Sequence, residues 1–533
     1  MVINPDQVGL EHDDGIYLIL GKALSEGNGL RLINLPSSPH QAKYPPVYPF
    51  FISLIWNWVQ FPQNIVWMKL INVAFLFLIL LEAHFLSLIL LDNARLWAVL
   101  ITLLVGTSAG TLYISSNLLS EIPYLFFSLT AVLFSLQAEK QQTGGKACAR
   151  KYVFYFLSVL SASLAFHTRT IGLSLLLALA LRVVFSKSSL TITAFFLFSI
   201  LVFNLPWVVW AKVYAPGPDI NPLLHYYIAY TPSAVGLSSI FDIETLSATV
   251  PANLLYLFEN VSAVISNSSV RLKPLMVVVW GILFLGVWKT LHDKRYPLIH
   301  LYLILYGLTF LYWPSLPLSR LRYFVPLAPF LFVIFFRGVL AFNSQLAGFA
   351  QSRRIWLYSR ALMCLLLFPN VPIGIRTTLE LKSNPYWDGF KETISWIKLN
   401  TEKDAILACT YDPLYYLYTG RVGLRPWIVK ETIYYRSSEK VGDPDYHFRL
   451  LKQLDVRYLI QEPLAAEEGR PLMQLISTMI KRHQDELALV FVSRDGIHRI
   501  YEIQYPQGRP SQDSAIQGNI QKEDGQRRLA SQT

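Results

Sequence analysis

Charged residues and cysteines are both scarce in this sequence. Asp, Glu, Lys and Arg make up 15% of its 533 residues, whereas soluble proteins carry about 25%. Together with a hydrophobic share of 53% and many long apolar runs, this deficit excludes an ordinary cytosolic enzyme and a disordered or fibrous chain. The three cysteines lie far apart, so the sequence gives no support for a disulfide framework or a cysteine metal cluster.

Common motifs of soluble enzymes are also missing. The sequence contains no G-x-x-x-x-G-K-[ST], no H-E-x-x-H and no C-x-x-C, so a mechanism with ATP or a nucleotide sugar has no support. The formal net charge of +11 resides in short Lys and Arg patches between apolar runs. Because such patches orient helices in a bilayer, we expect a membrane rather than a nucleic acid as the partner, and a polytopic α-helical membrane fold.

Apolar runs of about 20 residues can cross the hydrocarbon core as helices. The sequence contains such runs at about 64–91, 96–116, 119–138, 152–168, 171–186, 189–213, 274–291, 298–314, 322–341 and 357–373. Three connections are rich in Lys and Arg, at 140–151, 289–295 and 337–354, and positive loops remain in the cytoplasm. An even number of predicted spans separates these connections, so one threading satisfies all three. The outer face then receives the N-terminal 60 residues, the turns near Glu121 and Arg169, the loops at 214–272 and 315–321, and the chain after about 373.

The sequence therefore divides into four regions. We expect an external acidic loop with interfacial helices at 1–63, a transmembrane domain of about ten spans at 64–373, a small external α/β domain at 374–506 and a disordered tail at 507–533. Strand-like runs at 406–410, 456–460, 487–493 and 497–503 support the α/β domain. Because nothing before the first external loop could translocate it, we also expect one more hydrophobic span upstream of Met1.

Carboxylates and cations gather on the predicted outer face. Glu11, Asp13 and Asp14 immediately precede an apolar helix. One carboxylate suffices to cap a helix, so the group has two interpretations, capping and chemistry. The other ionisable residues on this face are Lys43, Glu121, Arg169, Arg320 and Arg322. Each arginine either extends its charge to the interface or faces a polar cavity.

This combination suits transfer from a lipid phosphate. A phosphate leaving group needs cations as its negative charge develops, and an acceptor hydroxyl needs a carboxylate to take its proton. Lys43 and the three arginines could meet the first need, and Asp13 or Asp14 the second.

Four short motifs resemble those of the GT-C class of membrane glycosyltransferases, of the protein O-mannosyltransferase and lipid A aminoarabinose transferase kind. Asp13, Asp14 and Tyr17 are similar to that family's D-E-x-x-Y, with Asp in place of Glu at the second position. Three later motifs of the family also have similar runs here: Lys-Tyr-Pro-Pro from Lys43, Ser-Glu-x-Pro from Ser120 and R-Y-x-x-P from Arg322. The four motifs occur in order, within about 1–373, and on one predicted face.

The resemblance implies a fold, a reaction and a set of roles. The fold would be GT-C-like, and the reaction would move a sugar, with inversion, from a polyprenyl-phosphate donor to a lipid, glycan or protein acceptor. The expected location is the bacterial plasma membrane, with the site on the external face. Asp13 would be the general base with Asp14 beside it, and Glu121 a second acidic residue. The expected contacts to donor phosphate are Lys43, Arg169, Arg320 and Arg322, and those to acceptor or sugar are Tyr17 and Tyr44.

Three points stay open at this level. Some GT-C enzymes bind a divalent metal and others do not, and the carboxylates permit either. A secondary transporter or flippase also has many spans, but transporters place their polar site near the bilayer midplane, where this sequence is mostly apolar. A non-catalytic scaffold whose external domain binds a partner would leave Asp13, Asp14 and Lys43 without a role.

Overall fold

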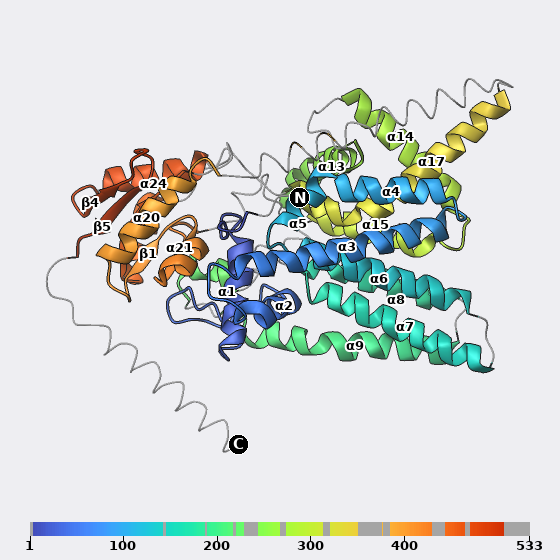
Figure 1. The fold of residues 1–533 in the computed structure, drawn as a ribbon, viewed down its shortest axis with the longest axis horizontal. Coiled ribbons are helices and arrows are strands. Elements are labelled where there is room, and N and C mark those ends of the chain that lie inside the picture. Colours follow the sequence, from blue (N-terminus) through green and yellow to red (C-terminus); the bar gives the residue numbers. More distant parts are fainter. Residues whose placement is uncertain are drawn as a thin grey trace, which may run out of the picture.

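The structure is a computed structural model that describes residues 4–141, 145–186, 189–216, 220–228, 243–266, 273–312, 320–349, 372, 376, 384–428, 443–463 and 470–505. Figure 1 shows two parts, a bundle of helices and a small sheet flanked by helices. Two short helices, α1 (Asp13–Ser25) and α2 (Val47–Trp56), lie between these parts and pack against each other. We call the end of the bundle that is next to the sheet the sheet end.

Most of the bundle is built from apolar helices that would expose much of their surface to lipid. Its elements are α3 (Ile65–Leu90), α4 (Arg95–Thr107), α5 (Ala109–Ser116), α6 (Glu121–Lys140), α7 (Gly145–Phe166), η1 (Thr170–Gly172), α8 (Leu173–Phe185), α9 (Leu190–Val213), α14 (Lys273–Thr290), α15 (Pro297–Tyr312), α16 (Arg320–Phe324), η3 (Val325–Leu327) and α17 (Ala328–Phe349). Large apolar side chains remain exposed, as on α9, where Leu190 is 85% exposed and Phe198 65%. Exposed apolar surface on this scale marks a membrane or partner interface.

Among the described residues, four helices are long and apolar enough to cross a membrane. Two shorter helices, separated by a bend, would form a fifth span if they cross the membrane together. The four are Ile65–Leu90, Glu121–Lys140, Leu190–Val213 and Leu321–Gln345; the pair, bent by 52°, is Arg95–Thr107 with Ala109–Ser116. The predicted spans at 171–186, 274–291 and 298–314 fall on shorter apolar helices, and the one at 152–168 falls on α7. The tenth, at 357–373, lies outside the described residues except for residue 372.

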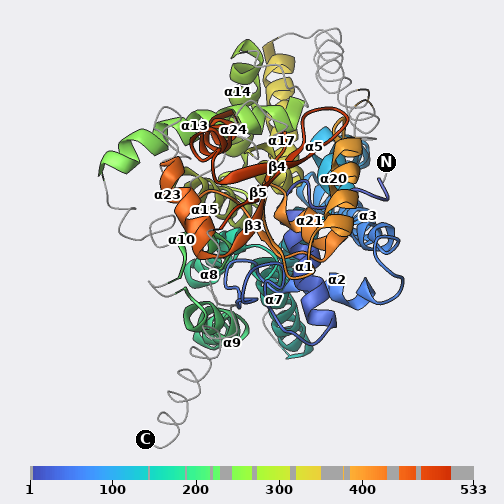
Figure 2. The ribbon, with the colours of Figure 1, turned by 90° about the vertical axis from the view of Figure 1, so that its left-hand side faces the viewer.

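The predicted external loop at 214–272 is not a simple loop. It contains α10 (Pro222–Ile228) and a long helix, α13 (Ile243–Ser266), which packs against α14, α15 and α16. In Figure 2 this helix extends across the sheet end of the bundle. No signal of a span is present in the sequence here because α13 is too polar for one and carries a proline, Pro251, within it; the external placement of this connection stays a prediction.

Two glycines allow α14 and α17 to cross at backbone contact. A Cβ atom on Gly286 would lie 2.1 Å from the carbonyl oxygen of Ile334, and one on Gly338 would lie 2.0 Å from that of Ile282. Close approach of this kind through small residues is a common way for helices to pack in membranes.

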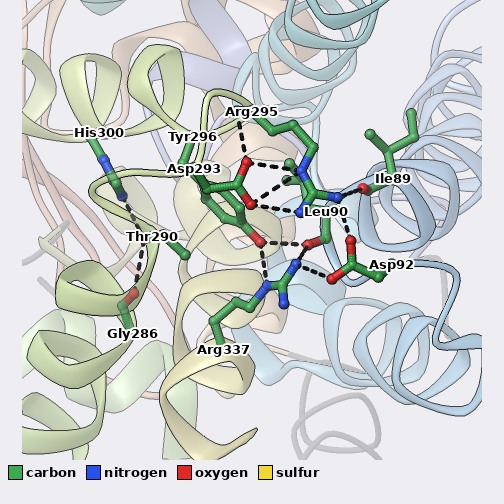
Figure 3. A network of polar contacts seen from close by, with 10 residues as sticks. All are labelled: Ile89, Leu90, Asp92, Gly286, Thr290, Asp293, Arg295, Tyr296, His300 and Arg337. Carbon is green, nitrogen blue, oxygen red and sulfur yellow. Dashed lines mark hydrogen bonds and ion pairs between the residues drawn. The ribbon is translucent and has the colours of Figure 1, made fainter. Parts of the chain in front are cut away.

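A network of arginines closes the opposite end of the bundle, which we call the basic end (Figure 3). The Arg295 guanidinium binds Asp293 and Asp92 at 2.6 and 2.7 Å. The Arg337 guanidinium reaches Asp92 at 2.8 Å and donates to the hydroxyl of Tyr296 at 2.8 Å. Both arginines also donate to backbone carbonyls at the end of α3.

The chain after the bundle forms an α/β region with a five-stranded sheet of order β2-β1-β3-β5-β4. β1 pairs in parallel with β2 and β3, and β5 is antiparallel to β3 and β4. Its elements are α20 (Trp387–Asn400), β1 (Ile406–Ala408), α21 (Asp412–Thr419), β2 (Gly423–Leu424), α23 (Pro444–Gln453), β3 (Val456–Gln461), α24 (Arg470–Arg482), β4 (Leu487–Val492) and β5 (Arg499–Ile503).

The predicted fold class, a polytopic helical bundle with a small C-terminal α/β region, is confirmed. The four predicted strands coincide with β1, β3, β4 and β5, whereas the two-residue β2 is too short to give a sequence signal. The proposed domain boundaries stay predictions, and the predicted tail at 507–533 lies outside the described residues.

The two ends of the bundle should face opposite sides of the membrane. All three Lys- and Arg-rich connections begin at the basic end, opposite the sheet (Figure 1), so this end is expected in the cytoplasm. In a chain whose native cysteines are replaced by serine, a reagent that does not cross membranes should label Asp388→Cys, whose native side chain is 89% exposed, and should miss Lys294→Cys at the basic end. The reverse pattern would contradict this orientation.

Glu462 should make the stability of the α/β region depend on pH. Its side chain is buried and accepts hydrogen bonds from the backbone N–H of Tyr411 at 3.0 Å and the hydroxyl of Tyr415 at 2.7 Å. Burial raises the pKa of Glu462 to about 7, against the smaller opposing effect of these donors. Because the folded state holds the proton more tightly than an unfolded chain with a pKa of about 4.3, the stability that Glu462 contributes is complete below about pH 4.3 and is lost as pH rises through about 7.

Glu462→Gln keeps an acceptor oxygen and removes the charge. The variant should be more stable than the unsubstituted protein at about pH 8 and similar to it near pH 4, as measured by melting temperature across that range. Glu402→Gln, at a side chain that is 57% exposed, is the control and should follow the unsubstituted protein. Parallel curves for Glu462→Gln and the unsubstituted protein would contradict the prediction.

Candidate active site

The acidic pair at the start of α1 divides into a structural and a chemical carboxylate. Asp14 is buried, and its two oxygens accept the backbone N–H groups of Gly9 and Glu11 at 2.7 and 3.1 Å. Asp14 therefore organises the loop before the helix. It does not cap α1, whose N-cap residue is His12 and which has no side-chain cap hydrogen bond, so the capping interpretation is not confirmed. Glu11 points elsewhere and accepts a hydrogen bond from the hydroxyl of Tyr113.

Asp13 instead faces charged and hydroxyl groups from distant parts of the chain. Its Oδ2 lies 2.6 Å from Nη2 of Arg322, and its Oδ1 accepts the Tyr44 hydroxyl at 3.1 Å. The Asp13 side chain is 27% exposed. Burial raises the pKa of Asp13, but Arg322, His12 and Lys43 outweigh it and hold the pKa well below its usual range. The Asp13 carboxylate is thus ionised at neutral pH and partly accessible.

Glu121 holds two arginines at the start of α6. Its side chain is 1% exposed and lies 2.7 Å from Nη1 of Arg169. Arg322 donates to the same carboxylate through Nε. Arg322 therefore bridges Glu121 and Asp13, and a carboxylate–arginine network joins α1, α6, α16 and the turn before η1. A charge-assisted hydrogen bond in a site shielded from water is stronger than one at the surface.

The two tyrosines of the predicted site sit beside this network. The Tyr17 hydroxyl and the Ser120 hydroxyl are 2.7 Å apart, and Arg169 donates to the same serine at 3.1 Å. The Tyr17 ring packs edge-on against Tyr44 at 5.5 Å. Both tyrosines are buried, and Tyr44 is the one that donates a hydrogen bond to Asp13.

A second group of cations surrounds Tyr226 on α10. Nζ of Lys43 lies 3.3 Å from the centroid of the Tyr226 ring and donates to the carbonyl oxygen of the same residue at 3.0 Å. The guanidinium of Arg425, which follows β2, lies 5.7 Å from that ring. Burial raises the pKa of Tyr226, but Lys43 and Arg425 together lower it to about 8. Positive charge is therefore concentrated beside Asp13, from the N-terminal loop and from the α/β region.

The structure brings most of the predicted site residues together. The contacts described above link six of them, and Lys43 is close enough to lower the pKa of Asp13; the six are Asp13, Tyr17, Tyr44, Glu121, Arg169 and Arg322. Asp14 adjoins them in sequence but points into the loop. The side chain of Arg320 lies outside the described residues. The resemblance left a metal open; among the described residues, no three His, Cys, Asp or Glu side chains are grouped closely enough to hold one.

Sequence reasoning missed Arg425, His12 and Asp412. His12 precedes Asp13 directly and was available as a signal, because a histidine beside an acidic pair is a titratable neighbour. Arg425 and Asp412 lie in a region that was expected to be a separate domain, and no motif surrounds them.

The structure is similar to that of ArnT from Cupriavidus metallidurans bound to undecaprenyl phosphate, with a TM-score of 0.56, 12% identity and coverage of 94% of this chain and 95% of that one. The chain has a GT-C fold. It is also similar to the Archaeoglobus fulgidus oligosaccharyltransferase tethered with an acceptor peptide, with a TM-score of 0.52, 11% identity and coverage of 93% and 70%.

A further structure of the archaeal enzyme, AglB with an inhibitory peptide and a dolichol-phosphate, gives a TM-score of 0.51 at 11% identity over 93% of this chain and 71% of that one. No protein-family model and no curated protein matches the sequence. The resemblance carried by the four motifs is thus confirmed for the GT-C fold, and identities this low leave the activity to be proposed from the site.

Removal of the Glu121 charge should destabilise the bundle. Glu121→Gln removes the carboxylate that Arg169 pairs with at 2.7 Å, and among the described residues Arg169 forms an ion pair with no other carboxylate. Breaking a buried ion pair costs roughly 3–5 kcal/mol, so the melting temperature in detergent should fall clearly. Glu139→Gln, on the same helix and in a half-buried pair with Arg182 at 2.9 Å, is the matched control and should lose about 1 kcal/mol. Equal losses would contradict a special role for Glu121.

Proposed function

We propose that this chain is a glycosyltransferase of the bacterial plasma membrane that moves a sugar from a polyprenyl-phosphate donor to an acceptor on the external face. Asp13 is the general base. The observation that carries the proposal is the ionised, partly exposed Asp13 carboxylate, which is held between Arg322 and Tyr44 and adjoins the cations around Tyr226.

The proposed reaction uses these groups in two places. The acceptor hydroxyl gives its proton to Asp13 as its oxygen bonds to the anomeric carbon, and the bond from that carbon to the phosphate oxygen breaks. The leaving polyprenyl phosphate gains negative charge, which nearby cations stabilise. Lys43 and Arg425 are suited to this role because Tyr226 holds both near Asp13.

Arg169 and Arg322 are less available to bind phosphate than Lys43 and Arg425. Both are committed to Glu121, and Arg322 also binds Asp13, so they contact a phosphate only through their remaining N–H groups. Their main proposed role is to hold Glu121 and Asp13 in place. Arg320, which the resemblance adds to the phosphate contacts, stays a proposal from the sequence alone.

The similar structures support this choice of donor. ArnT from Cupriavidus metallidurans binds undecaprenyl phosphate, and the archaeal AglB complex contains a dolichol-phosphate. Both are polyprenyl phosphates on a GT-C fold. The class of acceptor, whether a lipid, a glycan or a protein, is left to the assay, as is the choice between a hexose and a pentose.

Asp13→Asn should abolish transfer without loss of the fold. The purified protein is incubated with undecaprenyl-phosphate hexoses and pentoses that carry a radiolabelled sugar, and with membranes from a strain that lacks the gene. Transfer is measured as label that leaves the lipid-phosphate fraction. The rate should fall by about two to four powers of ten, the usual contribution of a general base.

Asp14→Asn is the matched control. It removes one charge from the neighbouring position, and its cost should appear as a lower melting temperature, because Asp14 accepts two backbone N–H groups. Its transfer rate per folded molecule should stay within a few fold of the unsubstituted protein. An active Asp13→Asn variant, or an inactive folded Asp14→Asn variant, would contradict the assignment of the base.

A further inference from the structure

His12 is held in an unusual conformation next to the proposed base. It is the residue before α1, with φ of 62°, and it is 5% exposed. Positive φ is uncommon for residues other than glycine and persists where surrounding contacts fix it, often at functional sites. The contacts that hold the His12 ring therefore bear on the function of the site.

The imidazole of His12 lies between two carboxylates from different parts of the chain. Its Nδ1 is 4.0 Å from Oδ1 of Asp13, and its Nε2 is 3.6 Å from Oδ1 of Asp412. Nε2 is buried and makes no hydrogen bond among the described residues. The other groups around the ring are Tyr226 and Tyr227, with centroids at 6.2 and 5.6 Å, and the charge of Arg425.

Asp412 is a fully buried carboxylate at the start of α21. Its oxygens accept the Tyr227 hydroxyl at 2.9 Å and the Asn34 side-chain amide at 3.2 Å. These two donors are neutral, and a buried carboxylate is costly without a nearby cation. The charge of Arg425 acts on Asp412 through space, and an imidazolium formed at His12 would add a second positive charge, on the side that faces Asp13.

Two glycines bring α21 into backbone contact with the segment that carries His12 and Asp13. A Cβ atom on Gly9, where φ is 85°, would lie 2.7 Å from Cα of Leu414, and one on Gly15 would lie 2.4 Å from Cβ of Pro413. Larger residues at these two positions would push α21 away. The α/β region is thus packed directly onto the acidic loop.

We infer that Asp412 and His12 are positioning residues for Asp13, and that His12 takes over the proton that Asp13 removes from the acceptor. The inference rests on the proposed function and extends it to the α/β region. In the reactive form of the site, which prevails above the pKa of His12, the imidazole is neutral, with Nε2–H directed at Asp412 and the lone pair of Nδ1 directed at Asp13. When the acceptor oxygen bonds to the sugar and the phosphate leaves, the proton passes from the acceptor to Asp13 and then to Nδ1. Asp13 returns to its carboxylate form, and the imidazolium that forms lies between the Asp13 and Asp412 carboxylates.

The pH dependence of this step has a definite sign. Burial and Arg425 lower the pKa of His12, but Asp13 and Asp412 outweigh them and raise it above its ordinary value of 6.5. Only the neutral imidazole accepts a proton, so the transfer rate should rise with pH through a value above 6.5. The ion pairs of the imidazolium stabilise the fold in full below about pH 6.5, and this stabilisation is lost as pH rises through the raised pKa.

The first experiment measures transfer from the same undecaprenyl-phosphate sugars as a function of pH. His12→Gln should lower the rate about tenfold or more and remove the rise above pH 6.5. Asp412→Asn should move that rise to lower pH, because the imidazole loses a neighbouring anion. Tyr418→Phe is the control: it changes another α21 contact to the N-terminal segment, a hydrogen bond from its hydroxyl to Asp6, and should leave the pH profile unchanged.

The second experiment does not depend on activity. Melting temperatures of the unsubstituted protein, His12→Gln, Asp412→Asn and the double variant are measured between about pH 5 and pH 9. The unsubstituted protein should lose more stability than His12→Gln as pH rises through the His12 pKa, because the loss due to Glu462 is common to both. The effect of Asp412→Asn should depend on pH only when His12 is present.

The outcomes separate this inference from the proposed function. If Asp13→Asn is inactive while His12→Gln keeps the normal rate and pH profile, the inference is overturned and the function stands. Absence of pH-dependent coupling between His12 and Asp412 in the melting experiment overturns it whatever the activity. If coupling is present but the unsubstituted protein releases no label from any donor, the Asp412–His12 pairing is supported, and the proposed function and the proton transfer fail together.

Discussion

The site depends on one interaction, the pairing of Arg322 with both Glu121 and Asp13. Each of these three residues lies on a different helix, and the guanidinium can meet both carboxylates only if α1, α6 and α16 are packed as observed. Arg169 adds a second cation to Glu121 and fixes the turn before η1. Charges that are so little exposed are stable only as a set, because loss of one leaves another buried without compensation. The same ion pairs therefore hold the helices together at the sheet end and position the charged groups of the proposed active site.

The α/β region is part of this arrangement rather than an appendage. Arg425 shares the Tyr226 ring with Lys43, and Asp412 faces His12. Both contacts require the backbone proximity that Gly9 and Gly15 allow. A glycine is needed at Gly9 for a second reason, since its φ of 85° is strained for any other residue.

The fold and most of the candidate site could be predicted from the sequence. The features that could not be predicted are those that depend on contacts between distant parts of the chain. The scarcity of charge and the length of the apolar runs follow from the bilayer itself, so the bundle was predictable. The order of four short motifs indicated the GT-C fold. The choice between Asp13 and Asp14 was not predictable, because both occupy the first turn of one helix and only the partners, Arg322 or backbone N–H groups, separate them. Asp412 and Arg425 could not be predicted because their partners are hundreds of residues away and no local pattern records such a contact.

The distance along the chain between Asp13 and Arg322 has a consequence for biosynthesis. They are 309 residues apart, and a ribosome that adds about 5–20 residues per second needs about 15–60 s to make the second after the first. During that interval the acidic loop has no Arg322 to neutralise it. A carboxylate that waited in the hydrocarbon core would be costly, whereas one at the end of the bundle can stay hydrated until its partner is made. The location of the acids on α1, outside the long apolar helices, thus suits the order of synthesis as well as the finished site.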